Sequence, residues 1–486
     1  MNYKGEIPNM SVDSAFLKAD SNKEDEQYYE SIRDECIKLI HTDANSQYSK
    51  SLNMLIELIH FNEQETLDFI LDYQLLNLIL ERIDLSYPSD VINSLNIIKN
   101  MVEIERYRDS IYQSDLVQNI LQLIHNTLDI DILADILDII AKLIKNSEEF
   151  FIHLIESEYI NEFCSQIMTI AGKLSSQHDY SKFSKYLFKF LSSCYFFGDI
   201  SIPEPLFNDI PDFIFSSLLN SSFEEINFKL QPLIMIINNF HDTFILNLTE
   251  VDKLSVLIDI LLNTLNNEFD HYLNSKIAKR ICLLLDSMFV SESSISLQLT
   301  KEDLINIHFF EALSQTFNAF PEVATVILSI IGKLVLLELI VDPEIPLELI
   351  SRANTELSLH EKNSYAFLFY SCSRILYNSF CQFVYENFDM IDGLLDILYG
   401  QDPSNIYSIM EGLVNIIEFA KAYSFDINLI IEKLTEHAIT KEFIQETMDL
   451  FSGDMNIYEC CIRFLSVFET EDTENINHEE DLDEYD

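Results

Sequence analysis

A helical pattern in this chain repeats after 41 residues, and this repeat limits the possible folds more than any other feature. One unit has an apolar stretch that starts at Leu75, a polar break that contains Pro88, and a second apolar stretch that starts at Val91. The same order returns with Leu116 in place of Leu75 and Ile132 in place of Val91. Apolar residues recur every three or four positions, which predicts helices with a wide apolar face. One helix pair cannot bury such a face alone, so the units must stack in a row.

Units of the same kind fill most of the chain. Two clear ones begin at Ile210 and at Met390, and each is followed by a second apolar helix, which ends at Phe240 in the first and covers residues 406–420 in the second. Weaker copies cover residues 254–289, 309–335 and 347–376. The pattern therefore predicts an all-α fold built from helical repeats.

The repeats are bounded by two polar ends. We expect a disordered N-terminal segment at residues 1–28, a helical repeat domain at residues 29–468 and a disordered acidic tail at residues 469–486. Stretches with Pro, Gly or Ser at residues 198–211 and 290–303 are predicted to be long loops between units.

Composition agrees with a helical array in a reducing compartment. The 486 residues include only 8 Gly and 10 Pro, too few for the many turns of a β-rich fold. None of the 8 cysteines shows C-x-x-C spacing, and no apolar signal segment follows Met1. We expect a cytoplasmic or nuclear protein.

The charge of the chain limits its partners. Lys and Arg number 30 against 81 Asp and Glu, a formal net charge of −51. The tail holds ten acidic residues and no Lys or Arg, so removing its ten charges from −51 leaves −41 for the body. Such a surface repels nucleic acid and anionic lipid, and it attracts basic or partly basic protein segments.

One apolar run resembles a membrane span. Val323 to Val341 is almost long enough to cross a bilayer, but Lys333 and Glu338 interrupt it and Pro321 precedes it. We interpret this run as a deeply buried helix of the array, and we expect no membrane association.

No catalytic or metal-binding pattern is present in the sequence. It has no G-x-G-x-x-G, no phosphate-binding loop, no H-E-x-x-H and no G-x-S-x-G, and no two of its 11 histidines have helical i, i+4 spacing. We therefore expect neither an enzyme nor a cofactor.

Two groups of cations lie on single helical faces. They are Lys182, Lys185 and Lys189, and Lys276, Lys279 and Arg280. They would either dock an acidic partner or, as we expect in so acidic a body, pair with carboxylates of the neighbouring unit.

The units resemble armadillo repeats, whose closing helix commonly reads apolar-x-Asn-apolar. Asn100, Asn239 and Asn415 stand in that pattern. The resemblance implies a right-handed superhelical solenoid with a concave groove, in which these amides would bind the backbone of an extended peptide.

The importin-alpha branch of that family is a particular comparison, because its acidic groove receives basic peptides. That branch places a Trp one turn before each Asn, whereas this chain has Asn96, Met235 and Glu411 there and no Trp at all. It also lacks the Arg- and Lys-rich N-terminal segment of that branch. Glu411 joins the three asparagines as a candidate groove residue.

The leading hypothesis is a non-enzymatic scaffold whose groove binds a segment of a partner protein. One alternative is an importin-alpha-like adaptor for basic cargo. Another is a regulatory scaffold subunit of a larger enzyme such as a phosphatase. The sequence does not fix the oligomeric state.

Overall fold

The computed structural model describes residues 29–466, apart from residues 43, 62, 113–115, 175–179, 199, 201–202, 204–205, 207–208, 249, 268–269, 290–298, 341–343, 351–357 and 401. In this part of the chain every regular element is helical, so the all-α prediction is confirmed. The predicted disordered ends, residues 1–28 and 469–486, lie outside the described residues.

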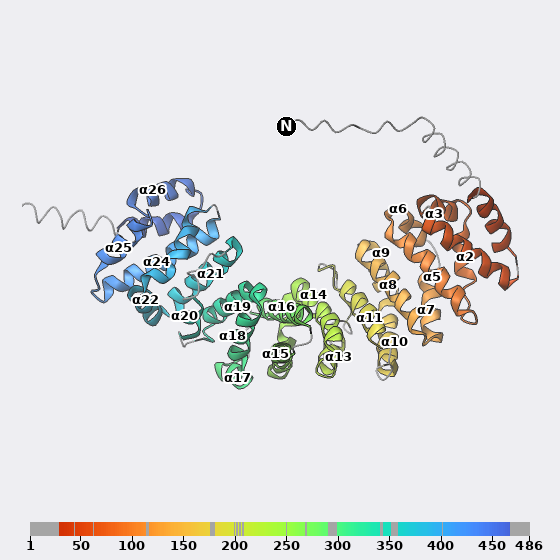
Figure 1. Cartoon of the computed structure of the whole chain (residues 1–486), viewed down its shortest axis with the longest axis horizontal. Coiled ribbons are helices and arrows are strands. Elements are labelled where there is room, and N and C mark those ends of the chain that lie inside the picture. The colour runs from red at the N-terminus through yellow and green to blue at the C-terminus, as the bar shows by residue number, and fades with distance from the viewer. Residues whose placement is uncertain are drawn as a thin grey trace, which may run out of the picture. The chain divides into compact units, whose positions relative to one another are not determined.

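The chain divides into two compact units, residues 1–211 and residues 212–486. This division falls at the end of the predicted loop at residues 198–211. Each unit is a stack of helices with its own core, and both units are drawn in Figure 1.

The first unit starts with a helix at residues 29–40. It continues with α2 (Asn45–Phe61), α3 (Glu63–Asp72), α4 (Leu75–Glu81), α5 (Pro88–Glu103), α6 (Glu105–Tyr112), α7 (Leu116–Asn126), α8 (Ile130–Asn146), α9 (Glu148–Glu156), α10 (Tyr159–Leu174) and α11 (Tyr180–Cys194).

The second unit contains α13 (Asp209–Leu218), most of which lies in it, α14 (Phe223–Leu248), α15 (Val251–Asn266), α16 (His271–Met288), α17 (Lys301–Asn306), α18 (Phe309–Ala319), η1 (Pro321–Val323), α19 (Ala324–Leu336), α20 (Glu344–Ile350), α21 (Leu359–Ile375), α22 (Tyr377–Glu386), η2 (Phe388–Ile391), α23 (Asp392–Leu395), η3 (Asp396–Tyr399), α24 (Pro403–Ala422), α25 (Ile427–Glu436) and α26 (Lys441–Leu450). A last described helix covers residues 455–466.

The helices recur as triplets that end in a long helix. In the first unit the triplets are α3, α4 and α5, then α6, α7 and α8, then α9, α10 and α11. The long helices pack on one another in order, α2 on α5, α5 on α8 and α8 on α11. In the second unit α14, α16, α19, α21 and α24 form the corresponding row. We call each of these two series the long-helix row of its unit.

The sequence repeat coincides with this packing. Leu75 and Leu116 are the first residues of α4 and α7, and Val91 and Ile132 are buried in α5 and α8. Pro88 is the first residue of α5, a position where the lack of an N–H costs nothing, because the first N–H groups of a helix have no acceptor within the helix. The short first helix of each triplet was not predicted, because two to three turns of helix carry too few apolar positions to show a clear period.

The turns inside the triplets use left-handed backbone without glycine. Gln74, Glu158, His308 and Ala438 have φ between 56° and 59°, and each stands between the first and second helix of its triplet. The N–H of Ala438 donates to Thr435 and the next N–H donates to Leu434, which closes the end of α25. This residue geometry costs about 1 kcal/mol or more outside glycine.

Of the apolar run at Val323 to Val341, Val323 ends η1 and residues 324–336 form the buried helix α19, as predicted for this part of the run. The ammonium group of Lys333 pairs with the carboxylate of Asp286 at 2.8 Å, which explains how a cation is accommodated there. Searched over the described residues, the chain has no helix with the length and apolar content that a bilayer crossing requires.

Three boundary predictions were wrong. The stretch from Met390 to Leu398 is not one helix but the short elements η2, α23 and η3. Gly393 weakens a helix there, and the carboxylate of Asp396 pairs with Lys362 of α21. The two predicted loops are also shorter than expected, since α13 begins at Asp209 and α17 begins at Lys301. A Thr300–Asp303 capping box fixes the start of α17.

Candidate partner-binding site

The three asparagines of the predicted groove all lie on long helices, and the two in the second unit do not lie on neighbouring helices. Asn100 lies on α5 in the first unit, and Asn239 and Asn415 lie on α14 and α24 in the second. Helices α16, α19 and α21 separate α14 from α24 in the row. Asn239 is half-buried, and the amide of Asn100 donates to the carbonyl of Asn96 at 2.8 Å.

Asn415 and Glu411 make contacts within the protein. Asn415 is only 9% exposed, and its amide donates to the hydroxyl of Ser373 on α21 at 3.3 Å. The Glu411 carboxylate accepts two hydrogen bonds from the Arg463 guanidinium, at 2.9 and 3.0 Å. Both side chains therefore connect α24 to its neighbouring helices.

Two of the three cations in the first predicted group pair as expected, whereas Lys185 lies over the Tyr186 ring. Lys182 forms an ion pair with Asp131, and Lys189 forms one with Asp138, both on α8 of the preceding triplet. The prediction was wrong for Lys276 and Lys279, since neither ammonium lies within ion-pair distance of any carboxylate that the structure describes.

Asp138 is the centre of the largest charge network in the first long-helix row. Its carboxylate is 4% exposed and contacts the ammonium groups of Lys99 on α5 at 3.0 Å, of Lys142 on α8 at 3.2 Å, and of Lys189 on α11. Burial opposes the ionisation of Asp138, but hydrogen bonds from Lys189 and Lys99 and the nearby positive charges outweigh burial and lower its pKa to about 2. One carboxylate thus joins three successive long helices.

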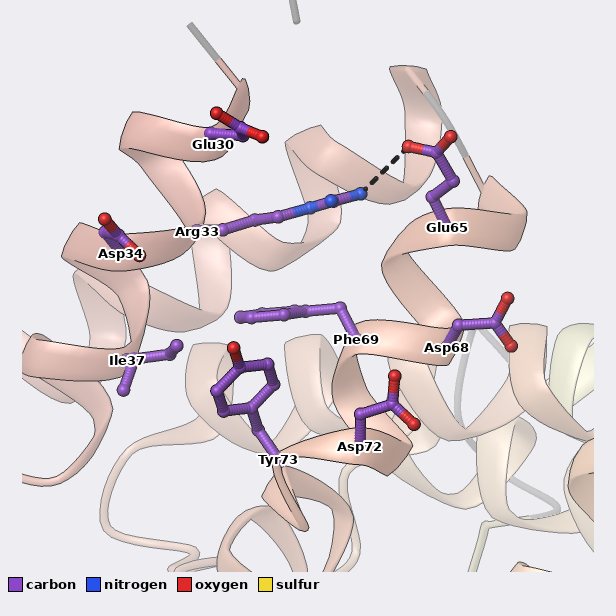
Figure 2. Close-up of a pocket in the computed structure, with 9 residues that line it drawn as sticks. All are labelled: Glu30, Arg33, Asp34, Ile37, Glu65, Asp68, Phe69, Asp72 and Tyr73. Carbon is purple, nitrogen blue, oxygen red and sulfur yellow. Dashed lines mark hydrogen bonds and ion pairs between the residues drawn. The ribbon is translucent and has the colours of Figure 1, made fainter. Parts of the chain in front are cut away.

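An acidic cleft with an aromatic floor lies between the helix at residues 29–40 and α3 (Figure 2). Its volume is about 470 Å³. The residues that line it are Glu30, Arg33, Asp34, Ile37, Glu65, Asp68, Phe69, Asp72 and Tyr73. We call it the acidic cleft.

Some of the charges in the acidic cleft are already paired. The Arg33 guanidinium binds the Glu65 carboxylate at 3.2 Å and lies over the Phe69 ring, 5.7 Å from its centre. Asp68 accepts hydrogen bonds from Arg106 and Tyr107 outside the cleft.

Three carboxylates of the acidic cleft remain available. Glu30, Asp34 and Asp72 have no ion-pair partner in the portion of the chain that the structure describes. Tyr73 is 54% exposed, and its ring lies 4.9 Å from that of Phe69. The cleft therefore combines unpaired negative charge with an accessible aromatic surface.

The sequence pattern does not by itself indicate this cleft. A weak signal was present, since Glu65, Asp68 and Asp72 share one face of α3 with Phe69 and Tyr73. In so acidic a chain that spacing is not distinctive, and the opposite wall comes from a different helix whose packing the sequence does not state.

Other kinds of site have little support in the described residues. No group of three His, Cys, Asp or Glu side chains among them is placed to hold a metal ion. All eight cysteines are buried, and burial raises the pKa of Cys36 and of Cys164 to about 12, which disfavours the reactive thiolate.

No family model matches this sequence, and no curated protein matches it. Solved structures do match its fold. An engineered protein aligns over 90% of this chain and 99% of its own, with a TM-score of 0.63 and 14% identity. A structure described as showing how a phosphorylation switch controls the interaction between cadherin and beta-catenin aligns over 91% of both chains, with a TM-score of 0.52 and 12% identity. At these identities the likeness establishes a helical-repeat fold and no activity.

Proposed function

We propose that this chain is a non-enzymatic scaffold that binds a basic segment of a partner protein. The proposal includes a right-handed, armadillo-like solenoid as the frame. The acidic cleft is the observation that carries it, because three unpaired carboxylates beside an exposed tyrosine suit a Lys or Arg side chain. The structural likeness to a chain from a structure described in terms of the interaction between cadherin and beta-catenin supports protein binding as the class of function.

The chemistry of the acidic cleft fits a basic peptide better than a small molecule. The aliphatic stem of a Lys or Arg would pack on Tyr73 while its charge approaches Asp34 and Asp72. A single exposed ion pair contributes only about 0.2–1 kcal/mol. Micromolar affinity, about −8 kcal/mol, therefore needs two or more cations together with the aromatic contact.

The test is a titration of the full-length chain with a fluorescent Lys-rich peptide at low and high salt. Asp34→Asn combined with Asp72→Asn is expected to weaken binding about tenfold and to reduce its salt dependence. A matched control, Asp449→Asn combined with Glu432→Gln on exposed helix positions of the second unit, should leave the affinity unchanged. Equal affinity for the cleft variant and the wild type would refute binding at this cleft.

The adaptor alternative places the basic cargo along the asparagines instead. It gains little from Asn415 and Glu411, whose polar groups are already bonded. Peptide binding that is lost in Asn239→Ala but retained in the cleft variant would support the adaptor. The alternative of a regulatory scaffold subunit, such as that of a phosphatase, predicts enzymatic activity that co-purifies with the chain from cells. All three proposals place the protein in the cytoplasm or nucleus without nucleic-acid or membrane contacts.

A further inference from the structure

A second cleft, of opposite charge, lies on the long-helix row of the second unit. Helix α14 contributes Gln231 and Ile234, α16 contributes Tyr272, Ser275, Lys276, Lys279, Arg280 and Leu283, and η1 contributes Glu322. Its volume is about 510 Å³. We call it the basic cleft.

Two charged groups of the basic cleft, Arg280 and Glu322, are hydrogen-bonded to neighbouring residues. The guanidinium of Arg280 donates to the carbonyl of Asn227, which fixes it in place. The carboxylate of Glu322 accepts a hydrogen bond from the Ser275 hydroxyl. Three cations thus face one carboxylate, in a chain whose net charge is −51.

Two cations of the basic cleft form no ion pair within the described residues, although the positive charge of Lys279 lies near the Glu322 carboxylate. Lys276 and Lys279 are exposed and form no ion pair with any residue in the described ranges. This distinguishes them from Lys182 and Lys189, which stand in the same kind of helical stripe and are paired. Two unpaired ammonium groups one turn apart are a recognition surface for carboxylates.

The floor of the basic cleft is apolar. Ile234 and Leu283 are half-buried, and Tyr272 is 78% exposed. An occupant must therefore offer apolar side chains between its carboxylates. A run of carboxylates alone would leave this apolar surface in water.

The end of this chain has that composition. Residues Glu479 to Asp486 read EEDLDEYD, which is six carboxylates with Leu482 and Tyr485 among them. No Lys or Arg occurs in this segment, so it cannot neutralise itself.

The segment is long enough to reach the basic cleft. The helix at residues 455–466 packs on α24, and α24, α21, α19 and α16 follow one another in the row. Packed helices lie about 8–10 Å apart, so the four steps amount to about 40 Å. Residues 467–478 can span about 40 Å when extended, at roughly 3.3–3.6 Å per residue.

We propose that the basic cleft is the docking site of the chain's own acidic segment at residues 479–486. Lys276 and Lys279 bind its carboxylates, and Tyr272 and Leu283 contact its apolar side chains. This goes beyond the proposed function, since it concerns another cleft in the other unit and an anionic occupant. Because the segment is tethered, its effective concentration is of millimolar order, and an external acidic ligand must compete with it.

The first experiment measures this competition in the full-length chain. The probe is a fluorescein-labelled synthetic peptide of residues 479–486. One variant neutralises the tethered segment through Glu479→Gln, Glu480→Gln, Asp481→Asn, Asp483→Asn and Glu484→Gln. We expect this variant to bind the probe at least tenfold more tightly than the wild type, because its basic cleft is vacant.

Charge reversal then locates the binding. In the neutralised chain, Lys276→Glu with Lys279→Glu should abolish probe binding. Lys173→Glu with Lys421→Glu, the same charge change at exposed lysines elsewhere, should preserve it. Equal probe affinity in the wild-type and neutralised chains would overturn the proposal, as would binding that survives charge reversal at Lys276 and Lys279.

A carbodiimide that couples touching ammonium and carboxylate groups gives an independent measurement. Mass spectrometry of the wild-type chain should find Lys276 or Lys279 joined to residues 479–486, with a yield that does not change on tenfold dilution. A yield that falls with dilution would show that the segment comes from another chain, and the lack of such a product would show that this segment does not occupy the basic cleft. Either result contradicts intramolecular docking while leaving the acidic-cleft proposal untouched.

Discussion

Asp138→Asn should loosen the first unit more than any other single charge removal. The substitution keeps the size of the side chain but removes the charge that contacts Lys99, Lys142 and Lys189 on three successive long helices. A carboxylate whose pKa falls from 3.8 to about 2 on folding contributes about 2 kcal/mol. Removing one partner of a buried ion pair costs about 3–5 kcal/mol, so we expect a loss of about 2–4 kcal/mol.

The stabilisation from Asp138 should decrease as the pH falls. Because the pKa of Asp138 is lower in the folded chain, its contribution is fully present above pH 4 to 5 and is lost as the pH falls toward 2. The stability difference between wild type and Asp138→Asn should therefore shrink between pH 5 and pH 3. A difference that stayed constant over this range would exclude ionisation of Asp138 as its origin.

Hydrogen exchange is the appropriate assay, because a chain with two units need not unfold in one step. Peptides from α5, α8 and α11 should exchange faster in the variant, while peptides from the second unit keep the wild-type rate. Asp135→Asn is the matched control, since the Asp135 carboxylate is 19% exposed against 4% for Asp138 and, among the described residues, forms one ion pair, with Lys99 at 3.3 Å. Its cost should be below about 1 kcal/mol. Exchange in Asp138→Asn that equals exchange in this control would refute the reasoning.

Three further changes test the packing. Gly412→Ala should destabilise the second unit by about 1–3 kcal/mol, because the added Cβ would overlap the Phe369 ring. Gly172→Ala, at an exposed helix position, is the control and should be neutral or stabilising. Urea unfolding measures both changes. Ala438→Gly should raise the thermal midpoint, by relieving the left-handed backbone at φ 57°, and a lower midpoint would contradict this. Burial lowers the pKa of Lys229 to about 8 from 10.5, so wild-type stability should rise between pH 8 and 10.5, and Lys229→Met should abolish that rise in pH-dependent unfolding.

The sequence was sufficient for the repeat and for most helices, because these depend on local apolar periods. The 41-residue spacing located the first residues of α4 and α7. The apolar period wrongly predicted one continuous helix from Met390 to Leu398. This stretch is divided into η2, α23 and η3, and Asp396 within it forms an ion pair with Lys362 of another helix. The left-handed turns at Gln74 and Ala438 could not be predicted, because a residue in this conformation is normally a glycine and neither of these is.

The candidate site was harder to predict, because a polar side chain can bind a partner only if no residue of a neighbouring helix already bonds it. Asn415 fits the same sequence pattern as Asn100, but packing against Ser373 removes it from the surface. Glu411 shows the same effect, since Arg463 lies 52 positions later in the chain and neutralises it.

The two lysine stripes show the same dependence on the neighbouring helices. Both have helical spacing and both occur in an acidic chain, so the sequence predicts pairing for each. Lys182 and Lys189 of the first stripe face Asp131 and Asp138 on α8 and form ion pairs with them. The second stripe faces the uncharged Gln231 and Ile234 on α14 and the single carboxylate of Glu322 on η1, and Lys276 and Lys279 stay exposed. A lysine stripe therefore becomes structural or available for binding according to the number and position of the carboxylates on the elements that pack beside it.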